Sequence, residues 1–149
     1  MKRILEIVLV VFTMILFSSF NKYNGETCSL TIEVNELRNS KGVVQFALYN
    51  KDGSLPDENY VRCYKILKGE IINNSSVATF ENIPAGIYAV NILHDENTNG
   101  KIDRTLILPK EGIGFSNYES IGLSNIPKFA KASINLKDDL KIKVKIIYM

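Results

Sequence analysis

The sequence FENIPAGIYAVNILHD, at residues 80–95, predicts two β-strands joined by one tight turn. Pro84 sets the backbone angle that a turn needs at its first central position, and Gly86 suits the exit from the turn. The run Ile87–Leu93 that follows is apolar and rich in residues that favour strands. This segment therefore predicts a β fold in which a polar loop follows the second strand.

Short segments in which apolar and polar residues alternate recur through the rest of the chain, separated by turn residues such as those at 39–42 and 51–53. Such a series is typical of two packed antiparallel sheets. We therefore predict an all-β fold: a single antiparallel β-sandwich, immunoglobulin-like or transthyretin-like, over residues 28–149. The alternating segments are Leu30–Val34, Val44–Leu48, Val77–Phe80, Ala132–Leu136 and Ile142–Tyr148.

Two segments fit this pattern less well. Tyr60–Leu67 is compatible with a short helix and with an edge strand. Residues 109–127 contain prolines and glycines and show no period, which predicts a long irregular loop. A long loop in a compact domain usually has a function or is held in place by contacts with other segments. We expect this one to lie beside the polar loop that follows residue 94.

The N-terminus resembles an export signal. Lys2 and Arg3 precede an apolar run, Ile7–Phe17. This run is shorter than the roughly 20 residues that span a bilayer and matches the roughly 7–15 of a signal peptide. We predict a signal peptide at residues 1–20 and an exported protein that is periplasmic, surface-associated or secreted. The alternative is an uncleaved anchor, which would be the only contact with a membrane.

The net charge and the cysteines of the chain bear on which partners and which covalent links it can have. The chain has 18 basic and 16 acidic residues, a net charge of +2, which gives no reason to expect nucleic acid as a partner. Lys141, Lys143 and Lys145 alternate with apolar residues, as on a strand with one face in water. An oxidising compartment permits a disulfide between Cys28 and Cys63, although the sequence leaves open whether they pair.

The polar loop has the spacing of a calcium site. Oxygen-bearing side chains stand at alternate positions and a glycine follows, as in the first part of an EF-hand loop. The twelfth position of that loop, which should be glutamate, is Leu106. A carboxylate from the next segment is the candidate replacement. The predicted ligands are Asp95, Asn97, Asn99, Lys101 through its carbonyl, Asp103 and Glu111.

Ca²⁺ fits this ligand set better than Mg²⁺ or a transition metal, because the ligands are many and nearly all oxygen. The loop has few formal charges, which predicts weak binding, with a Kd on the order of 10⁻⁴ to 10⁻³ M. A turn without metal stays open as the alternative, since Asp, Asn and Gly are also ordinary turn residues.

The only histidine of the chain, His94, is the candidate for an enzymatic function. His94 as a base, with Asp95, Glu96 or Glu111, would suit a hydrolase. However, neighbouring residues on a strand point to opposite faces, and the chain lacks a nucleophile motif. We therefore predict no catalytic residues.

Four motifs occur in a fixed order, at residues 80–90, 94–103, 109–117 and 127–132. Together they resemble the bacterial domain of unknown function 2141 family over roughly residues 30–148. The resemblance implies an exported bacterial β-sandwich and assigns no activity. The chain differs from the family at 104–108, where Arg104 brings a positive charge beside the predicted cation site, and at 125–127.

These observations predict an exported binding or structural module for an unknown protein or glycan at the cell envelope. The loop Pro109–Asn117, with Phe115 and Tyr118, is the predicted contact surface, because aromatic residues make effective anchors. The alternative function is a metal-free adhesion or accessory domain.

Overall fold

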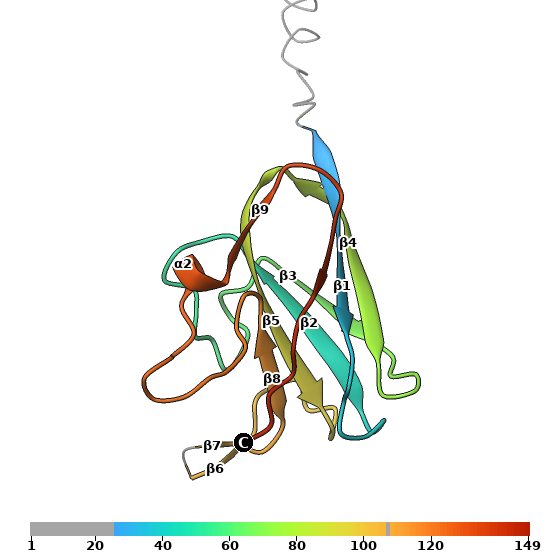
Figure 1. Cartoon of the computed structure of the whole chain (residues 1–149), viewed down its shortest axis with the longest axis vertical. Coiled ribbons are helices and arrows are strands. Elements are labelled where there is room, and N and C mark those ends of the chain that lie inside the picture. The colour runs from blue at the N-terminus through green and yellow to red at the C-terminus, as the bar shows by residue number, and fades with distance from the viewer. Residues whose placement is uncertain (1–25, 107) are drawn as a thin grey trace, which may run out of the picture.

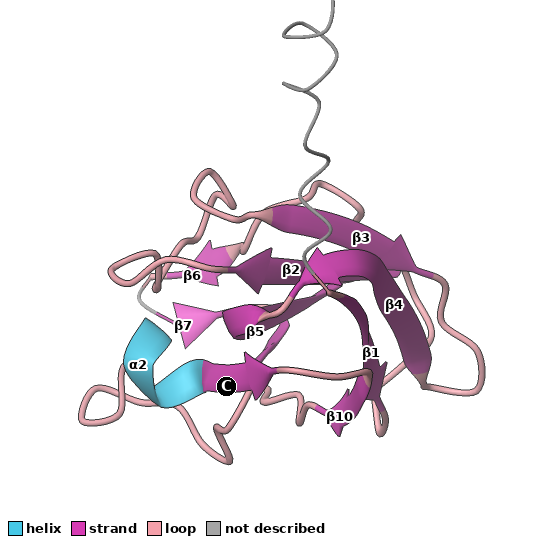
Figure 2. Cartoon of the chain, turned by 90° about the horizontal axis from the view of Figure 1, so that it is seen from above, coloured by secondary structure: helices cyan, strands magenta, loops and turns pink. Residues whose placement is uncertain are grey.

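The computed structural model describes residues 26–106 and 108–149, so the predicted signal segment at 1–20 lies outside the described residues. Within the described part, no helix is long and apolar enough to cross a membrane. The chain forms two sheets that pack face to face, as predicted for a β-sandwich (Figure 1, Figure 2).

The smaller sheet has the strand order β10-β1-β4. Its strands are β1 (Thr27–Val34), β4 (Ser76–Pro84) and β10 (Leu140–Lys143). In β1 the apolar residues alternate inward, as the sequence predicted, and Leu30, Ile32 and Val34 are fully buried. β1 pairs antiparallel with β4 but parallel with β10, which departs from a purely antiparallel sandwich.

The larger sheet has the order β3-β2-β5-β8, and β9 also pairs with β5. Its strands are β2 (Val43–Tyr49), β3 (Lys65–Gly69), β5 (Gly86–Asp95), β8 (Gly112–Phe115) and β9 (Ser133–Leu136). A short helix, α2 (Phe129–Ala132), precedes β9, and β6 (Arg104–Thr105) and β7 (Leu108–Pro109) form a separate two-stranded hairpin.

The larger sheet is buried on both faces. Phe46 and Ile92 point into the core between the sheets, where they join Leu30 and Ile32 of β1. On the opposite face, Tyr49 and other apolar side chains form a second cluster, with residues of the 113–132 segment. Burial on both faces explains why β5 is nearly continuously apolar instead of alternating.

The turn at Pro84-Ala85-Gly86 connects the two sheets. β4 ends at Pro84 in the smaller sheet, and β5 begins at Gly86 in the larger one. The predicted strand, turn and strand are therefore all present. The two strands are not hydrogen-bonded neighbours, because the chain crosses the core layer at this turn.

The prediction of one irregular loop over residues 109–127 is wrong in part, because β8 lies within it and pairs with β5. The C-terminal segment packs closely over the two glycines of this strand. A Cβ atom at Gly112 would lie 2.4 Å from a ring carbon of Tyr148, and one at Gly114 would lie 2.5 Å from the Lys145 carbonyl oxygen. The glycines allow this close approach, so here they do not mark turns.

Two other predictions concern the edges of the sheets. Of the segment Tyr60–Leu67, only the last three residues belong to the edge strand β3, and the preceding ones are irregular, so the helix alternative is wrong and the strand alternative is right only in part. At the C-terminus, Lys141, Lys143 and Lys145 face solvent while Val144 and Ile146 are buried, as the alternation predicted. Lys141 also pairs with Glu33 of the neighbouring strand at 3.1 Å.

Candidate metal centre

Asp95 ends β5 and forms the base of the polar loop. Its side chain is fully buried, and its two carboxylate oxygens accept hydrogen bonds from the backbone N–H groups of Asn99, at 3.0 Å, and Gly100, at 2.8 Å. Gly100 has a φ of +77°, a left-handed conformation that favours glycine. The chain therefore turns sharply at the predicted residue, with one carboxylate holding the turn together.

The side chains of Asn97, Asn99 and Asp103 meet within this turn. The amide nitrogens of Asn97 and Asn99 donate to the same Asp103 oxygen, at 2.6 and 2.8 Å. The amide oxygens accept from the backbone instead: that of Asn97 from the N–H of Asn99, and that of Asn99 from the N–H of Lys101, each at 3.0 Å. Three of the predicted ligands, Asn97, Asn99 and Asp103, thus converge.

Glu111 reaches the loop from the residue before β8. One carboxylate oxygen accepts the N–H of Glu96 at 3.0 Å, and the other accepts that of Asp103 at 3.4 Å. Burial raises the pKa of Glu111, and the charges of Asp95 and Asp103 act in the same direction. The predicted outside carboxylate therefore lies against the loop and bridges its two ends.

In the described part of the chain, the three acidic residues among the predicted ligands, Asp95, Asp103 and Glu111, form no ion pair, although Arg38 is close enough to Glu111 for their charges to interact. Arg104, which the sequence placed beside the loop, pairs instead with Glu58, with an Nε to carboxylate distance of 3.1 Å. Across the same residues, no three His, Cys, Asp or Glu side chains are arranged to hold a metal ion. A cation site here must therefore also use the asparagine amides.

Both ring nitrogens of His94 are already hydrogen-bonded to other residues of the protein. Its side chain is fully buried, and Nε2 lies 3.0 Å from the Lys41 carbonyl oxygen. A carbonyl only accepts, so Nε2 carries the proton and Nδ1 accepts from the Tyr148 hydroxyl at 2.7 Å. Glu96 beside it pairs with Arg38. Burial opposes ionisation of Glu96, but the hydrogen bonds from Arg38 and Asn39 outweigh it and lower the pKa.

Two further predictions can be compared with the side-chain positions. Cys28 and Cys63 are free thiols that pack against different hydrophobic clusters, so this structure has no disulfide between them. Phe115 and Tyr118 are each only 3% exposed, and their rings pack edge to face with centroids 6.0 Å apart. The prediction that these two aromatics face a partner is therefore wrong, because β8 buries that segment.

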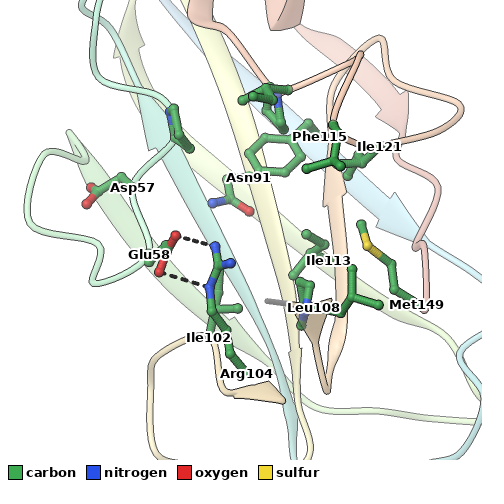
Figure 3. Close-up of a pocket in the computed structure, with 16 residues that line it drawn as sticks. Asp57, Glu58, Asn91, Ile102, Arg104, Leu108, Ile113, Phe115, Ile121 and Met149 are labelled. Atoms are coloured by element: carbon green, nitrogen blue, oxygen red, sulfur yellow. Dashed lines mark hydrogen bonds and ion pairs between the residues drawn. The ribbon is translucent and has the colours of Figure 1, made fainter. Parts of the chain in front are cut away.

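Sequence analysis missed a cleft on the outer face of the larger sheet, beside the β6–β7 hairpin (Figure 3). Its lining residues come from five separate stretches of sequence between Pro56 and Met149, so no local pattern marks it. The one available signal was Asn91, a polar residue in the otherwise apolar run Ile87–Leu93.

Comparison with known families shows which family the chain resembles. A family model described as "Uncharacterized protein conserved in bacteria (DUF2141)" matches residues 32–143. No curated protein and no solved structure matches the chain. The match confirms the resemblance that the four ordered motifs indicated, over nearly the same part of the chain.

Proposed function

The chain belongs to the DUF2141 family of uncharacterised bacterial proteins, and we propose that it is an exported domain whose loop at 95–103 binds Ca²⁺ together with Glu111. The ion would fix the shape of one end of the sandwich, where a protein or glycan partner of the cell envelope would bind. Export is proposed from the N-terminal sequence. The calcium site is supported above all by the position of Glu111.

Glu111 substitutes for the carboxylate that an EF-hand loop takes from its own twelfth residue. That position is Leu106, whose side chain is 98% exposed and has no ligand atom. Glu111 is only 4% exposed and contacts the loop at both ends, through the N–H groups of Glu96 and Asp103. A separate strand thus supplies a carboxylate where the loop itself lacks one.

The charge balance of the loop also favours a cation. Asp95 and Glu111 are buried. The negative charges of Asp95 and Asp103 both act to raise the pKa of Glu111. Buried carboxylates without a positive partner repel one another and lose hydration energy. A divalent cation would offset this repulsion, whereas a turn without metal would retain it.

Ion binding requires a small rearrangement of the asparagines. Their amide nitrogens now face Asp103, and an ion in this place needs the amide oxygens instead. Rotating each side-chain amide by 180° exchanges the positions of its nitrogen and oxygen without moving the backbone. The exchange gives up the hydrogen bonds that the N–H groups of Asn99 and Lys101 donate to the amide oxygens, which is consistent with weak affinity.

Calcium is expected to stabilise the folded protein measurably. With a Kd of about 10⁻⁴ to 10⁻³ M, about 10 mM CaCl₂ should raise the free energy of unfolding by about 1.4–2.7 kcal/mol relative to EDTA. Chemical denaturation in the two solutions measures this difference. The same concentration of MgCl₂ should give a much smaller shift, because Mg²⁺ keeps most of its own water.

The Glu111→Gln variant is the matched test, because it preserves shape and removes the charge of the outside carboxylate. It should lose most of the calcium shift while remaining folded in EDTA. The Glu119→Gln variant removes a charge from a side chain that is 87% exposed, and it should retain the full shift. An equal stability of the unmodified protein in calcium and EDTA would leave only the metal-free turn.

The pH dependence of stability should change sign with calcium. The pKa of Glu111 in the folded protein lies above its ordinary value of 4.5, so its ionisation costs stability as the pH rises through that folded value. In EDTA, the protein should therefore gain stability relative to Glu111→Gln as the pH falls from about 7 to about 4. In calcium the trend should reverse, because the ion needs the ionised form. Parallel pH profiles in both solutions would contradict this role of Glu111.

A further inference from the structure

A cleft of about 250 Å³ opens on the face of the larger sheet that turns away from the smaller one. Its walls are mostly apolar and include Ile102, Leu108, Ile113, Phe115, Ile121 and Ile126. An apolar cavity of about 150 Å³ is enough to hold benzene. The cleft therefore has room for a ring or short chain that carries one small polar group.

Asn91 lies in this cleft, between the Glu58–Arg104 pair and the side chains of Phe115 and Ile113 (Figure 3). The residue is fully buried in the middle of β5, and among residues 26–106 and 108–149 neither its amide nitrogen nor its amide oxygen has a hydrogen-bond partner. The nearby Tyr49 hydroxyl donates to Asp57 at 3.4 Å, and Asn91 is close enough to influence this hydroxyl without meeting the geometry of a hydrogen bond. A buried amide without partners destabilises the fold, so its presence calls for a binding partner.

The charged groups that line the cleft already have partners. Arg104 binds Glu58 through its guanidinium, and Asp57 accepts the N–H of Arg62 at 2.7 Å. In addition, the Nε atom of the Arg62 guanidinium lies 3.9 Å from the other carboxylate oxygen of Asp57. A charged ligand would lose its hydration here without gaining an unpaired counter-charge. The occupant that fits is therefore uncharged.

We propose that the cleft binds a small, mostly apolar molecule with one uncharged group that both donates and accepts, such as a primary amide. The amide group would pair with both free atoms of Asn91, while the apolar part contacts Ile113 and Phe115. Leu108 and Leu123, which line the cleft, have exposed side chains and extend its apolar surface towards solvent. The inference rests on Asn91 and is independent of the calcium proposal.

Three probes that share one ring separate the possible modes of recognition. Benzamide offers the amide, toluene lacks a polar group, and benzoate carries a charge. In a titration followed by NMR chemical shifts, benzamide should bind in the ~1 mM range expected for so small a molecule and shift the signals of Asn91, Ile113 and Phe115. Toluene and benzoate should bind at least tenfold more weakly. Equal binding of toluene, or no binding of benzamide, would overturn the proposal.

Two variants test the role of the amide. Asn91→Leu replaces the amide with an apolar side chain of similar size. Asn91→Ala leaves a small side chain like those of Ala47 and Ala89, which are buried in the same cluster, so at least one variant is expected to fold. Both should weaken benzamide binding at least tenfold, and Asn91→Leu should raise Tm, because it removes an unpaired buried amide. Unchanged benzamide affinity would overturn the proposal, and so would a lower Tm of the folded Asn91→Leu protein. Titration in EDTA as well as in CaCl₂ distinguishes failure of this site from failure of the calcium site.

Discussion

Replacing Gly114 with alanine is expected to lower the free energy of unfolding by about 3 kcal/mol. The new Cβ atom would lie 2.5 Å from the Lys145 carbonyl oxygen and 3.1 Å from a methyl carbon of Val144. The first contact is with backbone, which cannot move aside as a flexible side chain can. The C-terminal segment must therefore separate from β8 or shift as a whole. Chemical denaturation followed by circular dichroism measures the loss.

Gly122 provides the matched control for this substitution. A Cβ atom at Gly122 would have no neighbour within 4 Å, so alanine there should leave stability unchanged or raise it by about 0.4–1 kcal/mol through the unfolded chain. If Gly114→Ala were as stable as Gly122→Ala, the close packing of residues 144–148 over β8 would be wrong.

Replacing Asp95 with alanine is expected to cost about 2–4 kcal/mol in EDTA and to abolish the response to calcium. The carboxylate is fully buried and accepts the N–H groups of Asn99 and Gly100. Without it, the Gly100 N–H would lose its acceptor, and the Asn99 N–H would keep only the Asn97 amide oxygen. Because Asp95 is also the first proposed ligand, the further stabilisation by calcium should disappear. Denaturation in EDTA and in about 10 mM CaCl₂ measures both effects.

Glu119→Ala is the control for Asp95→Ala, because it also removes one carboxylate but from an exposed position. Its side chain is 87% exposed, and its contact with Lys145 lies at the surface. We expect it to change stability by less than about 0.5 kcal/mol and to keep the calcium response. A full calcium response in Asp95→Ala would place the ion elsewhere or rule out the proposed ligand set.

The polar loop shows how far sequence spacing alone can predict a site. The positions of Asp95 and Gly100 predicted a tight turn, and the structure has it, because an Asp carboxylate and a left-handed glycine are local devices. The contact of Glu111 with that loop was also expected, although only as a consequence of two segments lying close together. Its exact partners, the N–H groups of Glu96 and Asp103, depend on the pairing of β8 with β5.

The segment after residue 109 shows where the same reasoning fails. The glycines of this segment predict a loop, although the spacing of two between Gly112 and Gly114 also places both on one face of a strand. Phe115 and Tyr118 were expected at the surface and are buried. Both errors have one cause: whether a glycine marks a turn or a close approach depends on what packs against it, and that partner is a distant segment at 144–148.

The sequence by itself determined the β class, the buried face of β1, the turn at Pro84–Gly86 and the family, because these depend on residues close together in the chain. Only the tertiary structure decided that this turn joins different sheets, that β10 runs parallel to β1, and that Asn91 lies unpartnered in a cleft. These features arise from contacts between distant segments, which periodicity does not encode. A periodic pattern specifies which face of a strand is buried, but not which surface buries it.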